Sequence, residues 1–220
     1  MTDRLVLLSG GIDSTTTLAM ARTNVVDDER LGTISFNYGQ IHSKELQAAA
    51  KISKHYNAHH YEQDIPVRFD TVLTGTGEVP KGTYGDHPGL SPTYVPYRNG
   101  TLLSLATIVA VRDGWHEIWF GAHASDWNAW AYPDCSPEFM SHQEHAIWIG
   151  TDQTVRLITP IIKVPKSEVV KQGVELNAPI ELTWSCYRGG ERQCGTCPTC
   201  HERKAAFKAN DLVDPVSYAE

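Results

Sequence analysis

Short apolar runs alternate with longer amphipathic segments through most of the chain. The apolar run at 5–8 and the alternation of apolar and polar residues at 31–36 predict two β-strands. Elsewhere apolar residues recur at helical spacing, as Leu46, Ala49 and Ile52 do. Strands that alternate with helices predict an α/β fold with a doubly wound parallel sheet, because the crossover helices cover both faces of the sheet.

The same patterns place the other elements. The expected strands are residues 5–8, 31–36, 59–64, 117–120 and 155–159, and the expected helices are residues 14–22, 44–56, 99–113, 137–149, 166–173 and 201–209. Asn99 is expected to cap its helix, and Gly173 is expected to end the helix that begins at residue 166. The segment 73–97 is rich in Gly, Pro, Thr and Tyr, which predicts a long irregular loop of the kind that covers or binds a ligand.

The residues directly after the first predicted strand indicate a phosphate-binding loop. Residues 9–15 read SGGIDST, in which two glycines allow close backbone approach and polar side chains crowd the start of a helix. Free N–H groups and the positive end of the helix dipole favour an anion there. The order fits neither the Walker pattern nor the dinucleotide-binding pattern. It resembles the pyrophosphate-binding loop (PP-loop) of ATP pyrophosphatases; the alternative is an ordinary strand-to-helix turn.

Composition narrows the class of partner. The 220 residues carry 19 Lys and Arg against 26 Asp and Glu, a formal net charge of −7, so we expect a small-molecule substrate and no nucleic acid. The length suits one domain with a small appendage. No apolar run is long enough to span a bilayer and none has the form of a signal peptide, so we expect a cytoplasmic protein without membrane contact.

Four of the five cysteines cluster in the C-terminal part of the chain, with the spacing Cys186-x7-Cys194-x2-Cys197-x2-Cys200. Overlapping Cys-x-x-Cys units let thiolates close a tight chelate, and four thiolates suit structural Zn²⁺. The alternatives are an iron–sulfur cluster, His201 as the fourth ligand, or free buried thiols. We therefore expect a nucleotide-binding body at 1–180 and a four-cysteine zinc region at 181–220 packed on it.

Other candidate site residues follow strands or open a helix. Residues 9–14, 37–40 and 121–126 come directly after predicted strands, where parallel sheets bind ligands near a topological switch. Arg98 precedes the helix at 99–113 and could pair with a phosphate or carboxylate, or serve as an ordinary salt-bridge partner.

The stretch YPDCSPEF at 132–139 places two carboxylates, Asp134 and Glu138, among aromatic rings. Such a pocket suits a planar base, whose N–H groups the carboxylates accept; the alternative is that Asp134 caps the following helix. Cys135 has no evident paired base, so we interpret it as a small pocket residue rather than a nucleophile.

Several stretches together resemble the 7-cyano-7-deazaguanine synthase (QueC) family of the PP-loop ATP pyrophosphatase superfamily. They are LSGGIDSTT at 8–16, FNYGQ at 36–40 followed by His42, Glu45 and Leu46, VPYRN at 95–99, YPDCSPEF at 132–139, TPI at 159–161, and TWSCY at 183–187 with the cysteine cluster. Their order and spacing cover nearly the whole chain. The loop alone marks the superfamily, whereas the YPDC stretch and the cysteine-bearing tail are far more specific to the family.

The resemblance implies an ATP-dependent ligase that converts 7-carboxy-7-deazaguanine and ammonia to 7-cyano-7-deazaguanine, in queuosine or 7-deazapurine biosynthesis. It implies adenylated acid and amide intermediates, Mg²⁺ on the triphosphate, structural Zn²⁺ and a homodimer. Catalytic roles carry over to Asp13, Ser14 and Arg98. ATP-binding roles carry over to Leu8, Ser9, Gly10, Gly11, Ile12, Asp13, Ser14, Thr15, Tyr38 and Gln40. Substrate-binding roles carry over to Arg98, Asn99, Tyr132, Asp134 and Glu138, and metal-binding roles to Cys186, Cys194, Cys197 and Cys200.

One position departs from the family pattern, which has Arg after the cysteine of YPDC where this chain has Ser136. The missing cation leaves open a variant that stops at the amide. Another PP-loop adenylating enzyme, such as a tRNA-modifying thiolase or an amidotransferase synthetase, is a second alternative, although this acidic chain has room for neither an RNA-binding extension nor a glutaminase domain. A non-catalytic, zinc-stabilised nucleotide-binding module is a third.

Overall fold

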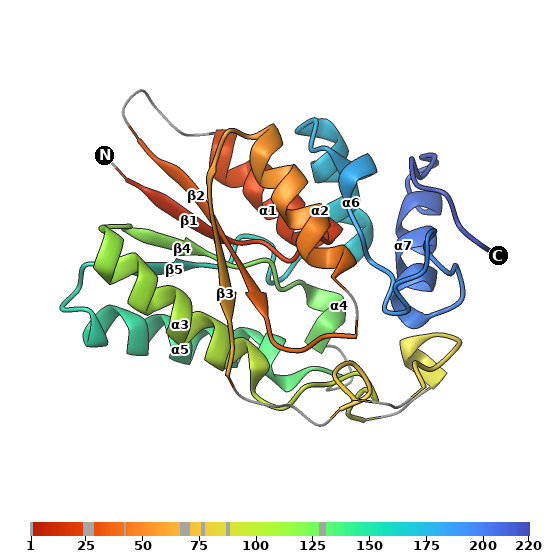
Figure 1. Cartoon of the computed structure of the whole chain (residues 1–220), viewed down its shortest axis with the longest axis horizontal. Coiled ribbons are helices and arrows are strands. Elements are labelled where there is room, and N and C mark those ends of the chain that lie inside the picture. Colours follow the sequence, from red (N-terminus) through yellow and green to blue (C-terminus); the bar gives the residue numbers. More distant parts are fainter. Residues whose placement is uncertain are drawn as a thin grey trace.

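The computed structural model describes residues 2–23, 29–41, 43–66, 71–75, 78–86, 89–127 and 131–220. Within them lies a five-stranded sheet in which every strand pairing is parallel. Its strands are β1 (Arg4–Leu7), β2 (Leu31–Asn37), β3 (His59–Asp64), β4 (Glu117–Trp119) and β5 (Arg156–Ile158). Their order, β3-β2-β1-β4-β5, confirms the predicted doubly wound parallel sheet (Figure 1).

Helices cover both faces of the sheet. They are α1 (Ile12–Thr23), α2 (Lys44–His55), α3 (Arg98–Asp113), α4 (Ala124–Trp127), α5 (Pro137–Gly150), α6 (Lys166–Glu175) and α7 (Pro198–Lys208). Figure 1 shows α3 and α5 on one side of the sheet and α1 and α2 on the other. The predicted strands and long helices are present with ends that differ by a few residues, and the short α4 was not predicted.

The alternation of side chains along β1 explains the two cores. Leu5 and Leu7 point to one face, where they belong to the same buried cluster as Leu103 of α3. Val6 points to the other face and joins Leu18 of α1. The apolar run at 5–7 therefore buries alternate residues on the two faces, as expected for a central parallel strand.

Gly173 lies inside α6, which continues to Glu175, so the prediction that this glycine ends the helix was wrong. A Cβ atom at position 173 would come within 2.5 Å of Thr16 Oγ1 on α1. The glycine therefore serves the close packing of α6 against α1, a contact between segments far apart in the sequence.

The start of α3 also differs from the prediction. The helix begins at Arg98, after Tyr97, whose backbone has the left-handed φ of 56°. Asn99 does not cap it, because it lies inside the helix, and its side-chain amide donates to the Asp134 carbonyl and to Cys135 Sγ. Non-glycine residues rarely hold a positive φ, and such backbone is concentrated at functional sites.

The segment after residue 180 packs on the body and is pinned by a buried ion pair. Arg203 of α7 is fully buried and donates to both oxygens of Asp214, each at 2.8 Å, and to Thr183 Oγ1 at 2.7 Å. The backbone N–H of Trp184 donates to the carbonyl of Gly10 at 2.8 Å. The C-terminal segment is thus joined directly to the loop after β1.

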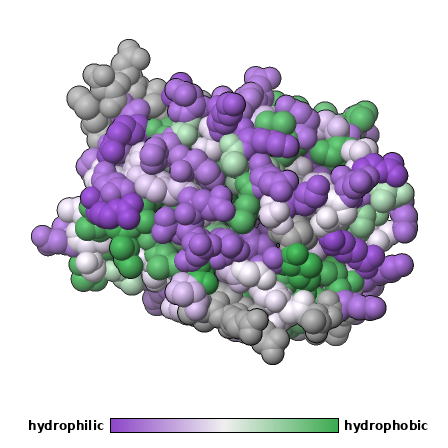
Figure 2. Space-filling model, in the orientation of Figure 1, coloured by the Kyte–Doolittle hydropathy of each residue, from purple (hydrophilic) through white to green (hydrophobic). Residues whose placement is uncertain are grey.

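The face of the molecule in Figure 2 is mostly hydrophilic, with hydrophobic residues in small separate groups. None of the helices in the described ranges combines the length and the apolar character needed to cross a bilayer.

Candidate active site

A cavity of about 230 Å³ opens at the carboxyl ends of β1, β2 and β4. The chain passes from β1 to β2 on one side and reaches β4 on the other, so β1 and β4 border the topological switch where parallel sheets bind ligands. All three predicted edge segments, 9–14, 37–40 and 121–126, contribute to the cavity wall.

The loop after β1 is shaped as an anion cradle. Gly10 has a φ of +86°, and a side chain there would collide with the backbone carbonyl of Glu45. The hydroxyls of Ser9 and Ser14 lie 3.0 Å apart, and the Ser14 hydroxyl donates to the Gly11 carbonyl at 3.1 Å. The first N–H groups of α1 have no helical acceptor and lie next to these hydroxyls.

Most of the predicted ATP-binding residues line this cavity. Those on its wall are Leu8, Ser9, Gly11, Ile12, Asp13, Ser14, Tyr38 and Gln40. Gly10 and Thr15 do not line it: Gly10 forms the turn, and the buried Thr15 hydroxyl donates to the Gly11 carbonyl at 2.8 Å.

Asp13 anchors a charged cluster at one side of the loop. Lys166 Nζ, from the first turn of α6, lies 2.7 and 2.5 Å from the two Asp13 oxygens. His123 Nε2 lies 3.6 Å from Asp13 Oδ1 and 3.4 Å from Asp126 Oδ1. Burial acts to raise the pKa of Asp13, but Lys166 and His123 outweigh it and the pKa is lowered. Asp13 therefore stays ionised and holds the Lys166 ammonium beside the loop.

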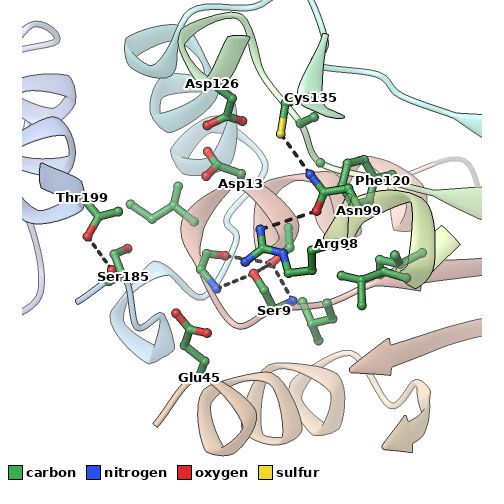
Figure 3. Close-up of a pocket in the computed structure, with 18 of the residues that line it drawn as sticks. Ser9, Asp13, Glu45, Arg98, Asn99, Phe120, Asp126, Cys135, Ser185 and Thr199 are labelled. Atoms are coloured by element: carbon green, nitrogen blue, oxygen red, sulfur yellow. Dashed lines mark hydrogen bonds between the residues drawn. The ribbon is translucent and has the colours of Figure 1, made fainter. Parts of the chain in front are cut away.

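Arg98 faces the cavity, and no carboxylate in the described part of the chain is paired with it. Its Nη1 donates to the Tyr38 hydroxyl at 3.2 Å and its Nη2 approaches Asn99 Oδ1 at 3.5 Å. Its Nε is buried and has no hydrogen-bond partner in the described ranges, where the guanidinium also forms no ion pair within 4.0 Å. In Figure 3, Arg98 and Ser9 project into the same space. A guanidinium so placed is suited to bind an anion.

The YPDC stretch divides into residues on the cavity and residues behind it. Tyr132 and Cys135 line the cavity together with Asn99, but Asp134 and Glu138 do not. The buried Asp134 carboxylate accepts the backbone N–H of Asn99 at 3.0 Å, so it holds α3 rather than the helix that follows it.

Ser136 caps α5 by accepting the N–H of Phe139 at 3.1 Å and does not line the cavity. The position that departs from the family pattern is therefore a helix cap in this chain.

Two tyrosines that were not among the predicted site residues complete the wall. The hydroxyls of Tyr84 and Tyr187 lie 3.3 Å apart, and the Tyr84 ring packs edge-on against Tyr132. Tyr84 belongs to the predicted irregular segment, so part of that segment does line the cavity. His42, quoted for the resemblance, lies outside the described residues.

His123 lies in the predicted edge segment 121–126, whereas residue types and local spacing gave no signal for Lys166 or Glu202; all three line the cavity. Lys166 and Asp13 are 153 positions apart, and Lys166 opens an ordinary amphipathic helix. Glu45 was noted only as part of the resemblance, and it too lines the cavity.

The four C-terminal cysteines form a site that fits one metal ion. Their Sγ atoms all lie within 4.8 Å of one another. The N–H groups of Arg188 and Cys194 each donate to Cys186 Sγ at 3.3 Å, and that of Cys197 donates to Cys194 Sγ at 3.3 Å. Backbone N–H groups directed at sulfur stabilise thiolates, the form of cysteine that binds metal.

Comparison with known proteins agrees with this architecture. A family model described as queuosine biosynthesis protein QueC matches residues 3–211. A 7-cyano-7-deazaguanine synthase from Marinomonas sp. is 38% identical over 218 residues, covering 97% of each chain. Another from Archaeoglobus fulgidus is 40% identical over 217 residues, covering 96% of this chain and 88% of its own. The solved U34-tRNA thiolase NcsA from Methanococcus maripaludis aligns with 17% identity and a TM-score of 0.49, over 96% of this chain and 64% of its own, a likeness too weak to carry an argument.

Proposed function

The chain belongs to the QueC family of queuosine biosynthesis proteins, and from this membership we propose that it is an ATP-dependent ligase that makes 7-cyano-7-deazaguanine from 7-carboxy-7-deazaguanine and ammonia. The observation that carries the proposal is Arg98, a cation that has no carboxylate partner among the described residues and that faces an anion-binding loop across one cavity. A cavity with these two sites suits a nucleotide triphosphate and a second, carboxylate-bearing ligand.

In the first step the substrate carboxylate attacks the α-phosphorus of ATP. A carboxylate oxygen becomes bonded to phosphorus, and pyrophosphate leaves with the electron pair of the broken P–O bond. The N–H groups and hydroxyls of residues 9–14 hold the departing pyrophosphate, and Lys166 and Arg98 offset the charge that develops. The carboxylate, otherwise a poor electrophile, becomes an acyl-adenylate.

Ammonia then attacks the acyl carbon, and AMP leaves with the electron pair of the C–O bond, which gives the amide. The amide oxygen then attacks the α-phosphorus of a second ATP, and pyrophosphate leaves. The C–O bond to AMP breaks with its electron pair on AMP, and the nitrogen loses two protons in all, which gives the nitrile. Arg98, Asn99 and Tyr132 border the part of the cavity away from α1 and are proposed to hold the deazapurine. Asp134 does not line the cavity; it holds the Asn99 backbone, and its charge also acts on Arg98.

Two metals belong to the proposal. The carboxylates of Asp13 and Asp126 point into the same region of the cavity (Figure 3) and fit the oxygen ligands that Mg²⁺ prefers, and Mg²⁺ would neutralise triphosphate charge there. The four cysteines in a closed set fit structural Zn²⁺ in a C-terminal region at 181–220 packed on a nucleotide-binding body at 1–180.

The proposal is tested by incubating the purified protein with ATP, Mg²⁺, ammonium and 7-carboxy-7-deazaguanine. We expect pyrophosphate release that depends on the deazaguanine, and a product with the mass of the nitrile. A product that remains at the mass of the amide identifies the variant that stops after one activation. Binding of ATP without any pyrophosphate release identifies a non-catalytic nucleotide-binding module and contradicts the proposal.

A further inference from the structure

Glu45 is a cavity carboxylate to which the proposed reaction has so far assigned no role. It lies in the first turn of α2, and its own backbone carbonyl abuts Gly10 of the phosphate loop. Its side chain lines the cavity. In Figure 3, Glu45 lies on one side of Ser9, and Asp13 and Asp126 lie on the other.

The surroundings of Glu45 differ from those of Asp13 and Asp126, two other acidic groups in the cavity. Asp13 and Asp126 lie within 4.0 Å of Lys166 or His123, whereas the Glu45 carboxylate has no hydrogen bond or ion pair within that distance in the part of the chain that the structure describes. The charged or titratable groups that act on it are Arg98 of α3 and Tyr38 after β2. A carboxylate with so few protein partners is suited to a ligand that brings its own N–H donors or positive charge.

Burial raises the pKa of Glu45 to about 7, although Arg98 opposes the shift. A group with such a pKa can accept a proton and return it near neutral pH, which is what a general base must do. The proposed reaction needs such a group, because ammonia is almost entirely protonated at neutral pH and ammonium is not a nucleophile.

We propose that Glu45 binds ammonium beside the activated substrate and removes the proton that makes it nucleophilic. This inference rests on the proposed function. The location suits the step: Arg98, which would hold the substrate's carboxyl end, lines the same cavity as Glu45, and its charge acts on Glu45, so the proposal places the ammonium on Glu45 beside the carbon that is attacked.

In this step one N–H bond of ammonium breaks, and its proton goes to Glu45 to give a neutral carboxylic acid and ammonia. The nitrogen lone pair forms a bond to the acyl carbon, and the C–O bond to AMP breaks with its electron pair on AMP. The new amide nitrogen then loses one more proton to solvent or to AMP, and Glu45 returns its proton to solvent.

The alternative occupant of Glu45 is a ribose hydroxyl of ATP, and the two are separated by measuring half-reactions. Glu45→Gln keeps the size of the side chain and removes its basicity. Exchange of pyrophosphate into ATP, dependent on 7-carboxy-7-deazaguanine, reports adenylation without ammonia. Hydroxylamine, which is uncharged at neutral pH, reports attack on the acyl-adenylate without a need for a base. Glu62→Gln, on an exposed position of β3, is the matched control.

For Glu45→Gln we expect exchange and hydroxamate formation at wild-type rates, and amide formation from ammonium reduced by about 100-fold or more at pH 7. At fixed total ammonium the wild-type rate should level off above about pH 7, while the variant's rate should keep rising by about tenfold per pH unit, following free ammonia. The wild-type plateau tests the proposal even if the variant does not fold.

Three results overturn the assignment while leaving the proposed function intact. They are an unchanged ammonium-dependent rate in Glu45→Gln, a loss of pyrophosphate exchange with a raised KM for ATP, and a wild-type rate that follows free ammonia without a plateau. Absence of exchange in the wild-type protein would instead contradict the proposed function itself.

Discussion

The carboxylate of Asp134 accepts the backbone N–H of Asn99 at 3.0 Å and so fastens the turn after Tyr132 to the first turn of α3. Asn99 completes the link by donating its side-chain amide to Cys135 Sγ at 3.1 Å. Because Arg98 is the residue before Asn99, this link also fixes the backbone from which the guanidinium reaches the cavity.

Asp134→Ala is expected to raise the KM for 7-carboxy-7-deazaguanine and to lower the free energy of unfolding by about 1–3 kcal/mol, because a buried N–H loses its acceptor. Asp134→Asn keeps an acceptor oxygen, so its KM and its free energy of unfolding should both stay closer to the wild-type values. Urea unfolding and steady-state kinetics measure the two effects. Ser136→Ala, which removes only the cap of α5, should cost about 1 kcal/mol and leave this KM unchanged. Equal shifts in KM for both positions would contradict a specific role for Asp134.

The same cap changes what is expected of Ser136→Arg. From the sequence, an added cation at 136 would tighten substrate binding or favour the nitrile. Since the Ser136 hydroxyl is bonded to the N–H of Phe139, away from the cavity lining, we now expect a small loss of stability and an unchanged ratio of nitrile to amide by mass spectrometry.

The pair of Asp13 and Lys166 leads to a prediction for the nucleotide half-reaction. Asp13→Asn and Lys166→Met should each reduce pyrophosphate exchange by about 100-fold or more, because each leaves the loop without an oriented cation. Circular dichroism should show the native fold in both. Lys163→Met, at an exposed position three residues earlier, is the control and should keep the wild-type rate. A wild-type rate in Asp13→Asn would mean that the loop does not hold the nucleotide.

Metal analysis should find about one Zn²⁺ per chain. Cys197→Ser should lose it, with a lower melting temperature and lower solubility, since metal binding is linked to folding. His201→Ala is the control: His201 is not among the four clustered ligands and its loss should leave the metal content unchanged. Protein that melts at the same temperature with and without metal would contradict a structural role.

The buried pair of Arg203 and Asp214 predicts a dependence of stability on pH. Burial acts to raise the pKa of Asp214, but the hydrogen bonds and charge of Arg203 outweigh it and the pKa is lowered from its ordinary 3.8. The pair therefore stabilises the protein above the pKa of an unfolded aspartate, and this contribution is lost as the pH falls through the lowered value.

Asp214→Asn should reduce the free energy of unfolding at pH 7 by about 3–5 kcal/mol, because it leaves the Arg203 charge buried and unpaired. Its stability should also change less between pH 5 and pH 3 than that of the wild-type protein. Urea unfolding at several pH values measures both, and parallel curves for the two proteins would contradict the assignment.

What could be predicted from the sequence is what short segments determine. Strand and helix periodicity gave the parallel sheet, the glycines and hydroxyls at 9–15 gave the loop, and four cysteines within fifteen residues gave the metal-binding cluster. In each of these features the residues that act together are close in the sequence, so their spacing predicts the structure they form.

The rest depends on contacts between distant segments. The pairing of Lys166 with Asp13 spans 153 positions, and the contact of Gly173 with Thr16 spans a similar distance, so neither leaves a local pattern. That no carboxylate among the residues described by the structure pairs with Arg98 could not be known before the fold placed its surroundings. Asp134 was recognised as a candidate, but only the structure shows that it acts on α3.

The hydrogen bond from Trp184 to Gly10 is made by main-chain atoms on both sides. Substitution of either side chain leaves the main-chain donor and acceptor of this hydrogen bond in place, so point mutations can miss the importance of the bond. A chimera that joins residues 1–180 of this chain to the cysteine-bearing end of a relative would have to reproduce a backbone path, whatever its sequence, for the loop to keep its shape. Exchange of C-terminal segments among relatives, rather than alanine scanning, is therefore the experiment that tests how the loop after β1 and the C-terminal segment fit each other.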